Sequence, residues 1–211
     1  MLNIEQKDTL KEFINIAVGD AASLLSEMVN KRVRLSIPEV NLINLEEESD
    51  FDKHLLPQDL QGHVVSSSIR FGTQFNGRAQ LIFPADKSKL LVAMCLGEEE
   101  LDSISSDELT DADFDVIREI GNVILNAVVG GLGNLLEVKI EYDLPEVSML
   151  SLVEIEEEVN VAEDKYLLII HNDFVVEEAT VKGSVLVMMS IYSISYLLNK
   201  IDQIVDDIYA E

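Results

Sequence analysis

Basic side chains are scarce in this sequence, which has 15 Lys and Arg against 40 Asp and Glu and a formal net charge of −25. A protein that binds a phosphate backbone needs clustered basic side chains that displace counterions. The charge balance therefore excludes nucleic acid as a partner and favours partners that present local positive charge. Hydrophobic residues still make up 47% of the chain, which is enough to build a full core.

Cysteine and histidine are also rare. The one cysteine, Cys95, lies in an apolar run over 90–96, so it excludes a disulfide within the chain and is expected to be a core thiol in a reducing, cytoplasmic setting. No partner at metal-ligand spacing accompanies any of the three histidines, His54, His63 and His171. Because no Cys–His or Ser–His–Asp arrangement is present either, we expect no metal site, no nucleophile and no cofactor of the protein's own.

Uninterrupted apolar runs of membrane-spanning length are missing. The run over 120–136 is broken by residues that include Asn122, Asn126, Gly130, Gly131 and Gly133. The run over 185–198 is short and contains three serines. Residues 1–11 are already polar, which argues against a secretory signal. We therefore expect a cytoplasmic protein that does not insert into a membrane.

What the sequence does contain is one polar signature in two copies. Four residues recur 107 positions later: Asp8, Glu12, Asn15 and Pro38 as Asp115, Glu119, Asn122 and Pro145. Each proline begins the same tripeptide, Pro-Glu-Val, and the apolar alternation before it keeps its phase. A constant offset that preserves polar residues as well as pattern indicates an internal duplication with two equivalent sites.

Each copy of the signature puts a carboxylate and a carboxamide on one face of a helix, because Asp, Glu and Asn follow one another at spacings of four and three. The carboxylate can pair with a cation on a partner, and the neutral carboxamide can hold a water in a fixed direction. The pair is therefore suited to orienting water at another molecule's electrophile. One such pair is commonplace on a solvated helix. Two pairs in register favour a function, and the alternative is that the duplication preserved a fold-determining helix.

Hydrophobic periodicity predicts that each half of the chain runs helix, strands, helix. For the first half we expect a helix over 5–30, strands over 33–45, 63–75 and 78–83 with a hairpin at Asn76-Gly77, and a helix over 85–96. For the second half we expect a helix from about 107–110 to the glycines after 128, strands over 137–144, 147–157, 166–176 and 181–189, and a helix over 191–209. The expected apolar face of the first helix comprises Leu10, Phe13, Ile14, Ala17, Ala21, Leu24 and Met28.

Strands joined by hairpins imply an antiparallel sheet with helices packed on it, so the predicted fold is α/β of the α+β type. The duplication implies pseudo-two-fold symmetry. We expect a single domain over 1–211 that is made of two repeats, at about 1–100 and 101–211.

The repeated motif, Asp-x3-Glu-x2-Asn-x22-Pro, resembles the phosphatase signature of the CheC/CheX/FliY family of bacterial chemotaxis proteins. Two copies in one chain look like the CheC branch, and the resemblance covers nearly the whole sequence. It implies hydrolysis of the aspartyl phosphate of a CheY-like response regulator. It also implies that Glu12 and Glu119 dock on a lysine of the regulator and that Asn15 and Asn122 direct a water in line at the phosphate. Asp8, Asp115, Pro38 and Pro145 would support these residues.

The same resemblance implies two things about partners. The regulator itself would bring the Mg²⁺ and the acyl phosphate, and CheD, a receptor-modifying deamidase, is implied as a further partner. Two alternatives stay open: a non-enzymatic adaptor that binds CheD or a regulator, and a degenerate duplicate with one live site and one docking site. The intact Glu–Asn pair in both copies favours the enzyme.

The two copies depart from the family pattern in different places. Residues 119–122 read Glu-Ile-Gly-Asn, close to the usual family wording, whereas Ile14 and Ala17 stand in the first copy where glycines are usual. Bulk at these two positions could tilt the first helix or reshape its docking surface, so we rank the second site higher. Conversely, Asn126 replaces the small residue that matches Gly19, which makes the second site more polar.

Overall fold

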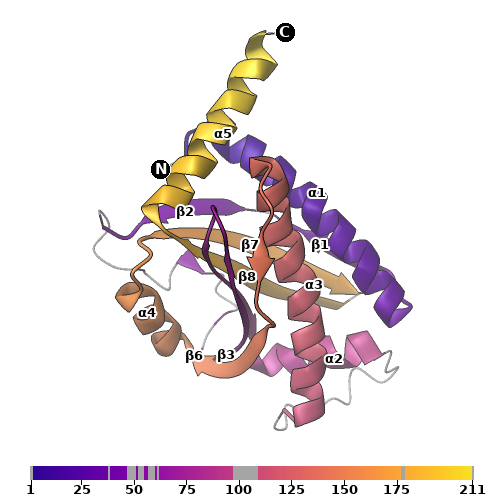
Figure 1. The fold of residues 1–211 in the computed structure, drawn as a ribbon. Coiled ribbons are helices and arrows are strands. Elements are labelled where there is room, and N and C mark those ends of the chain that lie inside the picture. Colours follow the sequence, from indigo (N-terminus) through magenta and orange to yellow (C-terminus); the bar gives the residue numbers. More distant parts are fainter. Residues whose placement is uncertain are drawn as a thin grey trace.

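The computed structural model describes residues 2–37, 39–46, 51, 55–56, 60, 62–96, 109–176 and 179–210. Along the chain these form α1 (Ile4–Val29), β1 (Val33–Ser36), β2 (Val40–Asn44), β3 (His63–Gly72), β4 (Gly77–Pro84), α2 (Ala85–Leu96), α3 (Asp111–Leu136), β5 (Glu141–Tyr142), β6 (Glu146–Ser151), α4 (Leu152–Val161), β7 (Tyr166–Val176), β8 (Ala179–Met189) and α5 (Ile191–Ala210). The expected fold, an antiparallel sheet with helices packed on it, is confirmed (Figure 1).

The sheet interleaves strands from the two halves of the chain. Its order is β1-β7-β8-β4-β3-β5, with β2 also paired to β7 and β6 also paired to β3, and all of these pairs are antiparallel. Counted inward from the two edges, β1 corresponds to β5, β7 to β3 and β8 to β4. Each of these pairs takes one strand from each half of the chain. Such an arrangement is what a duplicated chain would form, although the duplication and the single domain with two repeats stay predictions.

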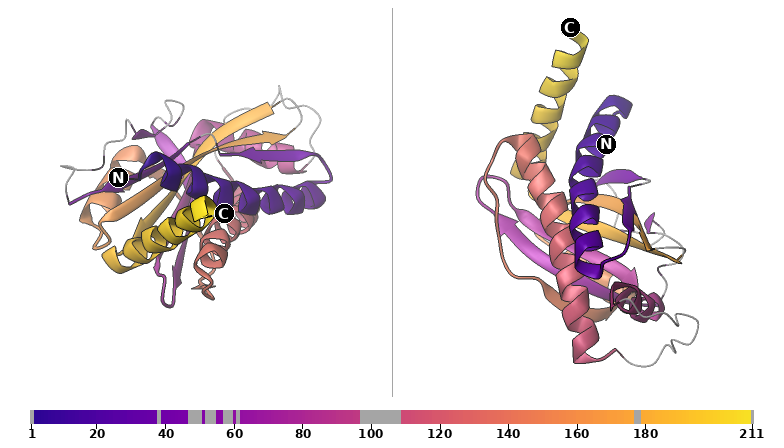
Figure 2. Two further views of the ribbon diagram at one scale, coloured as in Figure 1. Left: turned by 90° about the horizontal axis from the view of Figure 1, so that it is seen from above. Right: turned by 90° about the vertical axis from the view of Figure 1, so that its right-hand side faces the viewer.

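The two faces of the sheet belong to two separate hydrophobic clusters, of which one is larger. The main core joins one face to α1, α2, α3 and α5, and a second cluster joins the other face to α4 and to Phe51, Leu56 and Leu60. Residues of β7 alternate between the two clusters, with Leu168 and Ile170 in the first and Leu167 and Ile169 in the second. Figure 2 shows α1 and α3 side by side on the sheet and running in opposite directions, with α5 projecting beyond them.

The predicted strand over 147–157 is wrong in its second half. The strand β6 ends at Ser151, whose side chain accepts a hydrogen bond from the backbone N–H of Glu154. The Glu154 carboxylate in turn accepts one from the backbone N–H of Ser151. This capping box starts α4, which buries Leu152, Ile155 and Val159 at helical spacing. Glu156, Glu157 and Glu158 therefore lie on a helix.

Four further boundaries differ from the sequence expectation. The strand expected over 33–45 is two strands, and the segment 137–144 forms a strand only at Glu141–Tyr142. The β3–β4 connection occupies 73–76, so Asn76-Gly77 is not a two-residue turn. The helix expected to stop at the glycines continues through them to Leu136. Packing against α1 explains this continuation, because a Cβ on Gly131 would lie 2.6 Å from the Cβ of Ala17.

The buried face of α1 was predicted correctly only in part, because Phe13 and Ala17 are half-buried and Val18 is buried instead. Leu10, Ile14 and Ala21 are buried, but Leu24 and Met28 are 56% and 52% exposed. The buried positions after Ala21 are Leu25 and Val29, one residue further along. After Ala21, the buried stripe of α1 is therefore rotated slightly around the helix axis relative to the predicted apolar face.

Of the helices in the described part of the chain, only α3 is long and apolar enough to cross a membrane by length and composition. Half of its apolar window is buried inside the fold, and the core helix of a soluble protein passes the same test. The other apolar run, 185–198, is divided between β8 and α5.

Candidate functional site

The start of α3, which carries the second motif, is held in place by its N-cap. Thr110 and Asp113 form a capping box, and Lys89 of α2 lies 3.8 Å from the Asp113 carboxylate. Burial alone would raise the pKa of Asp113, but the hydrogen bonds from Thr110 and the charge of Lys89 hold that pKa below its usual value. The register of the motif residues that follow on α3 is therefore fixed from its first turn.

The core side of α3 explains the glycine within the second motif. A Cβ on Gly121 would lie 2.2 Å from the Oγ of Ser67 on β3, so only glycine allows the helix to approach the sheet this closely. Ile120 and Ile124 on the same side are buried. The motif carboxylates Asp115 and Glu119 are exposed on the opposite side, and Asn122 is half-buried between the two sides.

Two side-chain contacts distinguish the polar face of α3. Arg118 forms an ion pair with Asp115, and the Nδ2 of Asn126 donates a hydrogen bond of 2.9 Å to the Oδ1 of Asn122. Glu119 makes no ion pair within the described residues. Neither contact was predicted from the sequence, although the spacings of three and four residues are those at which helical side chains meet.

The first motif lies on α1 with the same exposure pattern. Asp8 and Glu12 are exposed and Asn15 is half-buried. Within the described chain, Asn15 has no side-chain hydrogen bond, and the Cβ position of Gly19, one turn later, has no atom within 4 Å. The polar face of α1 thus repeats the motif without the two contacts seen on α3.

Ile14 and Ala17 lie away from the polar face of α1. Ile14 is 1% exposed in the main core, and Ala17 meets Gly131 where α1 crosses α3. The helix itself is continuous from Ile4 to Val29. Bulk at these positions therefore sets how α1 sits on the core and on α3, rather than the shape of the Glu12–Asn15 surface.

The two motifs point to two separate surfaces. Because α1 and α3 run in opposite directions and cross at Ala17 and Gly131, the first motif lies beside the second half of α3 (Figure 2). The second motif lies nearer the beginning of α3, on the far side of the crossing. One partner surface could therefore engage one Glu–Asn pair while the other stays open.

Of the two motif prolines, the structure describes Pro145. Pro38 is outside the described residues. Pro145 is buried immediately before β6, and Val147 of that strand packs with Val116 and Ile117 of α3. A shallow cavity of about 350 Å³ between the two elements is lined by Asp115 and Arg118 among others. Pro145 thus directly precedes a strand that packs against α3, and its supporting role stays a prediction.

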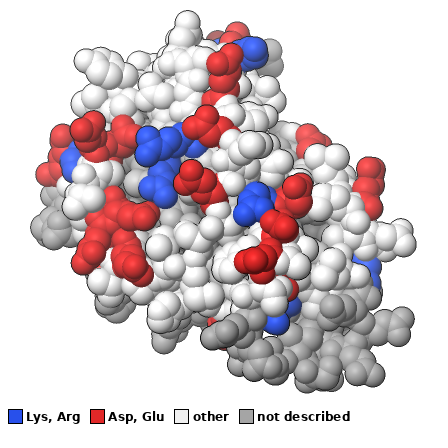
Figure 3. All heavy atoms as spheres, turned by 60° about the horizontal axis from the view of Figure 1, so that its bottom comes forward, with Lys and Arg blue, Asp and Glu red and all other residues white. Residues whose placement is uncertain are grey.

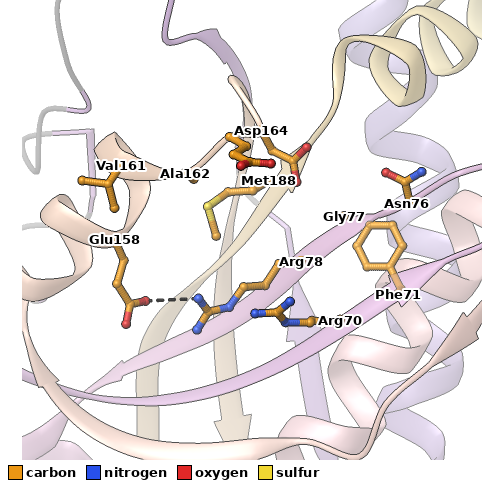
Figure 4. Close-up of a pocket in the computed structure, with 11 residues that line it drawn as sticks. Arg70, Phe71, Asn76, Gly77, Arg78, Glu158, Val161, Ala162, Asp164 and Met188 are labelled. Carbon is orange, nitrogen blue, oxygen red and sulfur yellow. Dashed lines mark ion pairs between the residues drawn. The ribbon is translucent and has the colours of Figure 1, made fainter.

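A larger cavity lies elsewhere, on the face of the sheet that α4 covers. It has a volume of about 620 Å³ and is lined by Arg70, Arg78, Glu158 and Asp164 among others, with an ion pair of 3.4 Å between Arg78 and Glu158 (Figure 4). None of the motif residues lines it. A surface that receives another folded protein needs exposed side chains rather than a deep pocket, so the distance of this cavity from the motifs does not weigh against them.

The groups that would support other chemistries are poorly placed for them. Burial raises the pKa of Cys95 to about 12, so its thiol stays protonated near neutral pH. Among the described residues, no three His, Cys, Asp or Glu side chains gather into a possible metal site. Figure 3 shows acidic side chains spread over the viewed face with small basic groups among them.

Comparison with solved structures gives the class of the fold. FliY of Thermotoga maritima superposes with a TM-score of 0.74 at 18% identity, over 96% of this chain and 98% of that one. A chain of the FliM–SpeE complex from H. pylori superposes with a TM-score of 0.66 at 11% identity, over 96% of this chain and 97% of that one. No family model matches the chain. The chain therefore has a CheC/CheX/FliY-type fold.

In sequence the chain is similar to CheC. The CheY-P phosphatase CheC of Bacillus subtilis strain 168 is 24% identical over 147 residues, which cover 69% of this chain. They cover 66% of that protein, just under two thirds of its length. The resemblance inferred from the motif is therefore confirmed, whereas the roles of the individual site residues stay predictions.

Proposed function

We propose that this protein hydrolyses the aspartyl phosphate of a CheY-like response regulator in chemotaxis signalling. The observation that carries the proposal is the pair of equivalent sites. On each of two neighbouring helices an exposed glutamate stands one turn before a half-buried asparagine, at Glu12 and Asn15 and at Glu119 and Asn122. The similarity to a protein named CheY-P phosphatase supports the same reading.

The glutamates are the docking groups of the proposed reaction. Glu119 is exposed and has no ion pair within the described residues, so its carboxylate is available to a lysine of the regulator. The net charge of −25 adds a long-range attraction for a positively charged docking face. Both effects are screened by salt over about 8–10 Å.

The asparagines are the water-orienting groups. A carboxamide oxygen at Asn15 or Asn122 would accept a hydrogen bond from the attacking water and so aim its lone pair at phosphorus. A bond forms between the water oxygen and phosphorus, and the bond from phosphorus to the aspartyl oxygen breaks. Inorganic phosphate leaves as H2PO4−, with the oxygen and both protons of the water, and the regulator recovers its aspartate carboxylate. Alignment of this kind suits phosphoryl transfer, in which the protein contributes little covalent chemistry.

The rest of the catalytic apparatus belongs to the regulator. We propose that the regulator supplies the acyl phosphate together with Mg²⁺, which neutralises charge on the phosphoryl oxygens. The protein would then need no cofactor of its own and would act in the cytoplasm, where such regulators are found. Asp8 and Asp115 flank the docking surface one turn before each glutamate and would tune its charge.

The direct test is the decay of a phosphorylated CheY-like regulator with this protein at substoichiometric concentration. An enzyme accelerates the decay of all the regulator present, because each molecule turns over repeatedly. A protein that only binds changes the decay of at most an equal amount of regulator.

A second candidate is an adaptor without turnover, which binds CheD or a regulator. The observation that favours it is the fold shared with FliM, a protein whose solved structures include complexes with SpeE and FliG. Such a fold therefore presents protein-binding surfaces even in a protein whose name carries no catalytic function. Binding of CheD to the Asn15→Ala/Asn122→Ala variant, measured by calorimetry, would show whether an adaptor role is independent of the motif.

A further inference from the structure

Asn126 lies one helical turn after Asn122 and contacts its carboxamide directly. Its Nδ2 donates a hydrogen bond of 2.9 Å to the Oδ1 of Asn122. Nothing in the family motif calls for a residue at this position. The contact is nevertheless made to the oxygen atom that the proposed reaction would use to hold the attacking water.

The arrangement of Asn126 is not explained by stability. Its own Oδ1 is buried and has no hydrogen-bond partner. A buried acceptor without a partner costs free energy, and asparagine is a weaker helix former than the alanine or leucine that α3 uses nearby. A residue kept at such a cost inside a helix is better explained by what its other atom does.

The first site provides an internal comparison. Gly19 stands at the position of α1 that matches Asn126, and a Cβ there would have no neighbour within 4 Å. Asn15 accordingly has no side-chain hydrogen bond within the described residues. The two asparagines of the motif thus differ in one respect that bears on chemistry: the Asn122 carboxamide is held and the Asn15 carboxamide is not.

We propose that Asn126 is a positioning residue, which fixes the Asn122 carboxamide by occupying one lone pair of its Oδ1 and leaving the second lone pair to a water. A carbonyl oxygen has two acceptor directions, so the hydrogen bond from Asn126 does not compete with the water. It removes rotation about the Cβ–Cγ bond of Asn122, which would otherwise have to be frozen in each catalytic event. This inference rests on the proposed phosphatase function.

The proposal predicts a change in turnover without a change in docking. In an Asn15→Ala background, which leaves only the second site, Asn126→Ala should lower kcat about five- to twentyfold, because orientation is lost. The dissociation constant for a regulator held in its phosphorylated form by beryllofluoride should change less than about twofold. The thermal midpoint should stay the same or rise, because the substitution removes an acceptor that is buried without a partner.

A double-mutant cycle separates positioning from a structural effect. When Asn122 is already alanine, the additional change Asn126→Ala should alter kcat by less than about twofold, because the group that it positions is gone. An equal fall of kcat in both backgrounds would overturn the proposal, as would full activity of Asn126→Ala.

The first site offers the reciprocal variant. Gly19→Asn introduces the missing side chain into open space, so it should fold normally and raise the kcat of the first site in an Asn122→Ala background. The matched control is Gly19→Ala, which adds the Cβ but no donor and should leave that kcat unchanged. A gain with both substitutions, or with neither, contradicts positioning by a side-chain donor.

A spectroscopic measurement keeps the inference testable if no phosphatase activity is found. NMR order parameters of the side-chain amides should be higher for Asn122 than for Asn15 in the wild-type protein, and Asn126→Ala should lower the Asn122 value to that of Asn15. Equal order parameters in the wild-type protein would overturn the positioning role. Rigid Asn122 without any regulator turnover would instead overturn the proposed function and leave the contact intact.

Discussion

The first and second halves of the chain carry the same polar motif on helices whose side-chain contacts differ. On α3 the asparagine of the motif is hydrogen-bonded by Asn126, whereas α1 has an open glycine, Gly19, at the matching position. The aspartate before the glutamate is ion-paired with Arg118 on α3, and no such pair is seen for Asp8 on α1 in the described chain. The two motifs thus share their polar residues and differ in the side chains that contact them.

The core sides of the two helices differ as much as their polar faces. The matching positions are Ile14 on α1 and Gly121 on α3. Ile14 fills the main core, whereas Gly121 lets α3 approach Ser67 on β3 too closely for any Cβ. The glycine of the second motif is therefore a packing requirement of one helix, and its absence from the first copy is no sign of a damaged site.

The largest expected effect concerns the two matching core positions, Ile14 and Gly121. Ile14→Gly would give the first repeat the glycine of the second, but it should lower the free energy of unfolding by about 3–5 kcal/mol, because it opens a cavity and places glycine inside a helix. Urea denaturation monitored by circular dichroism measures this loss. A change below about 1 kcal/mol would mean that Ile14 is not a core residue.

The next largest effect concerns the asparagines. Asn122→Ala should slow dephosphorylation at the second site by roughly ten- to a hundredfold, because it removes water orientation and leaves most of the docking surface. Phosphate release measured in an Asn15→Ala background isolates that site. Unchanged release in the doubly substituted protein would show that water is positioned by another group.

A third prediction separates docking from chemistry. Glu119→Lys should weaken binding to the regulator more than Asn122→Ala does, because it sets two positive charges against each other. The difference should shrink as salt rises, since exposed pairs are screened within about 8–10 Å. Titration calorimetry at low and high salt provides the comparison, and a loss that does not depend on salt would point to a structural role of Glu119.

The smallest effect sharpens the ranking of the two sites. Glu12→Ala/Asn15→Ala should remove less than half of the activity and Glu119→Ala/Asn122→Ala more than half. The physical reason is the hydrogen bond from Asn126 rather than any distortion caused by Ile14. Activity per folded protein is the appropriate readout, with folding checked by circular dichroism. Equal losses would leave two interchangeable sites and remove the basis of the ranking.

Much of the fold followed from local signals, and what escaped depended on tertiary packing. The bounds of α1 and α2 were predicted to within a residue or so, because apolar periodicity and turn residues fix them locally. The length of α3 was not, since Gly131 was taken as a helix end and instead allows contact with Ala17. The start of α4 was missed because the capping box of Ser151 and Glu154 lay inside a run that alternates like a strand.

For the candidate site, too, local geometry could be predicted from the sequence and tertiary contacts could not. Spacing alone placed Glu119 and Asn122 on one exposed helix face, because helical geometry leaves little choice. The hydrogen bond from Asn126 required knowledge of which side-chain rotamers the surrounding core allows. In the sequence, this contact is visible only as a spacing of four residues between two asparagines, which many unrelated pairs share.

The most direct test of the account is multiple-turnover decay of a phosphorylated CheY-like regulator with wild-type protein and with the Asn15→Ala/Asn122→Ala variant. The account predicts that wild-type protein, present well below the regulator concentration, clears the whole phosphorylated pool. The variant should bind the beryllofluoride-activated regulator as tightly but leave phosphoregulator decay at its intrinsic rate. A variant as active as the wild type would contradict water orientation by the two asparagines, and wild-type protein that never turns over would contradict the enzyme itself.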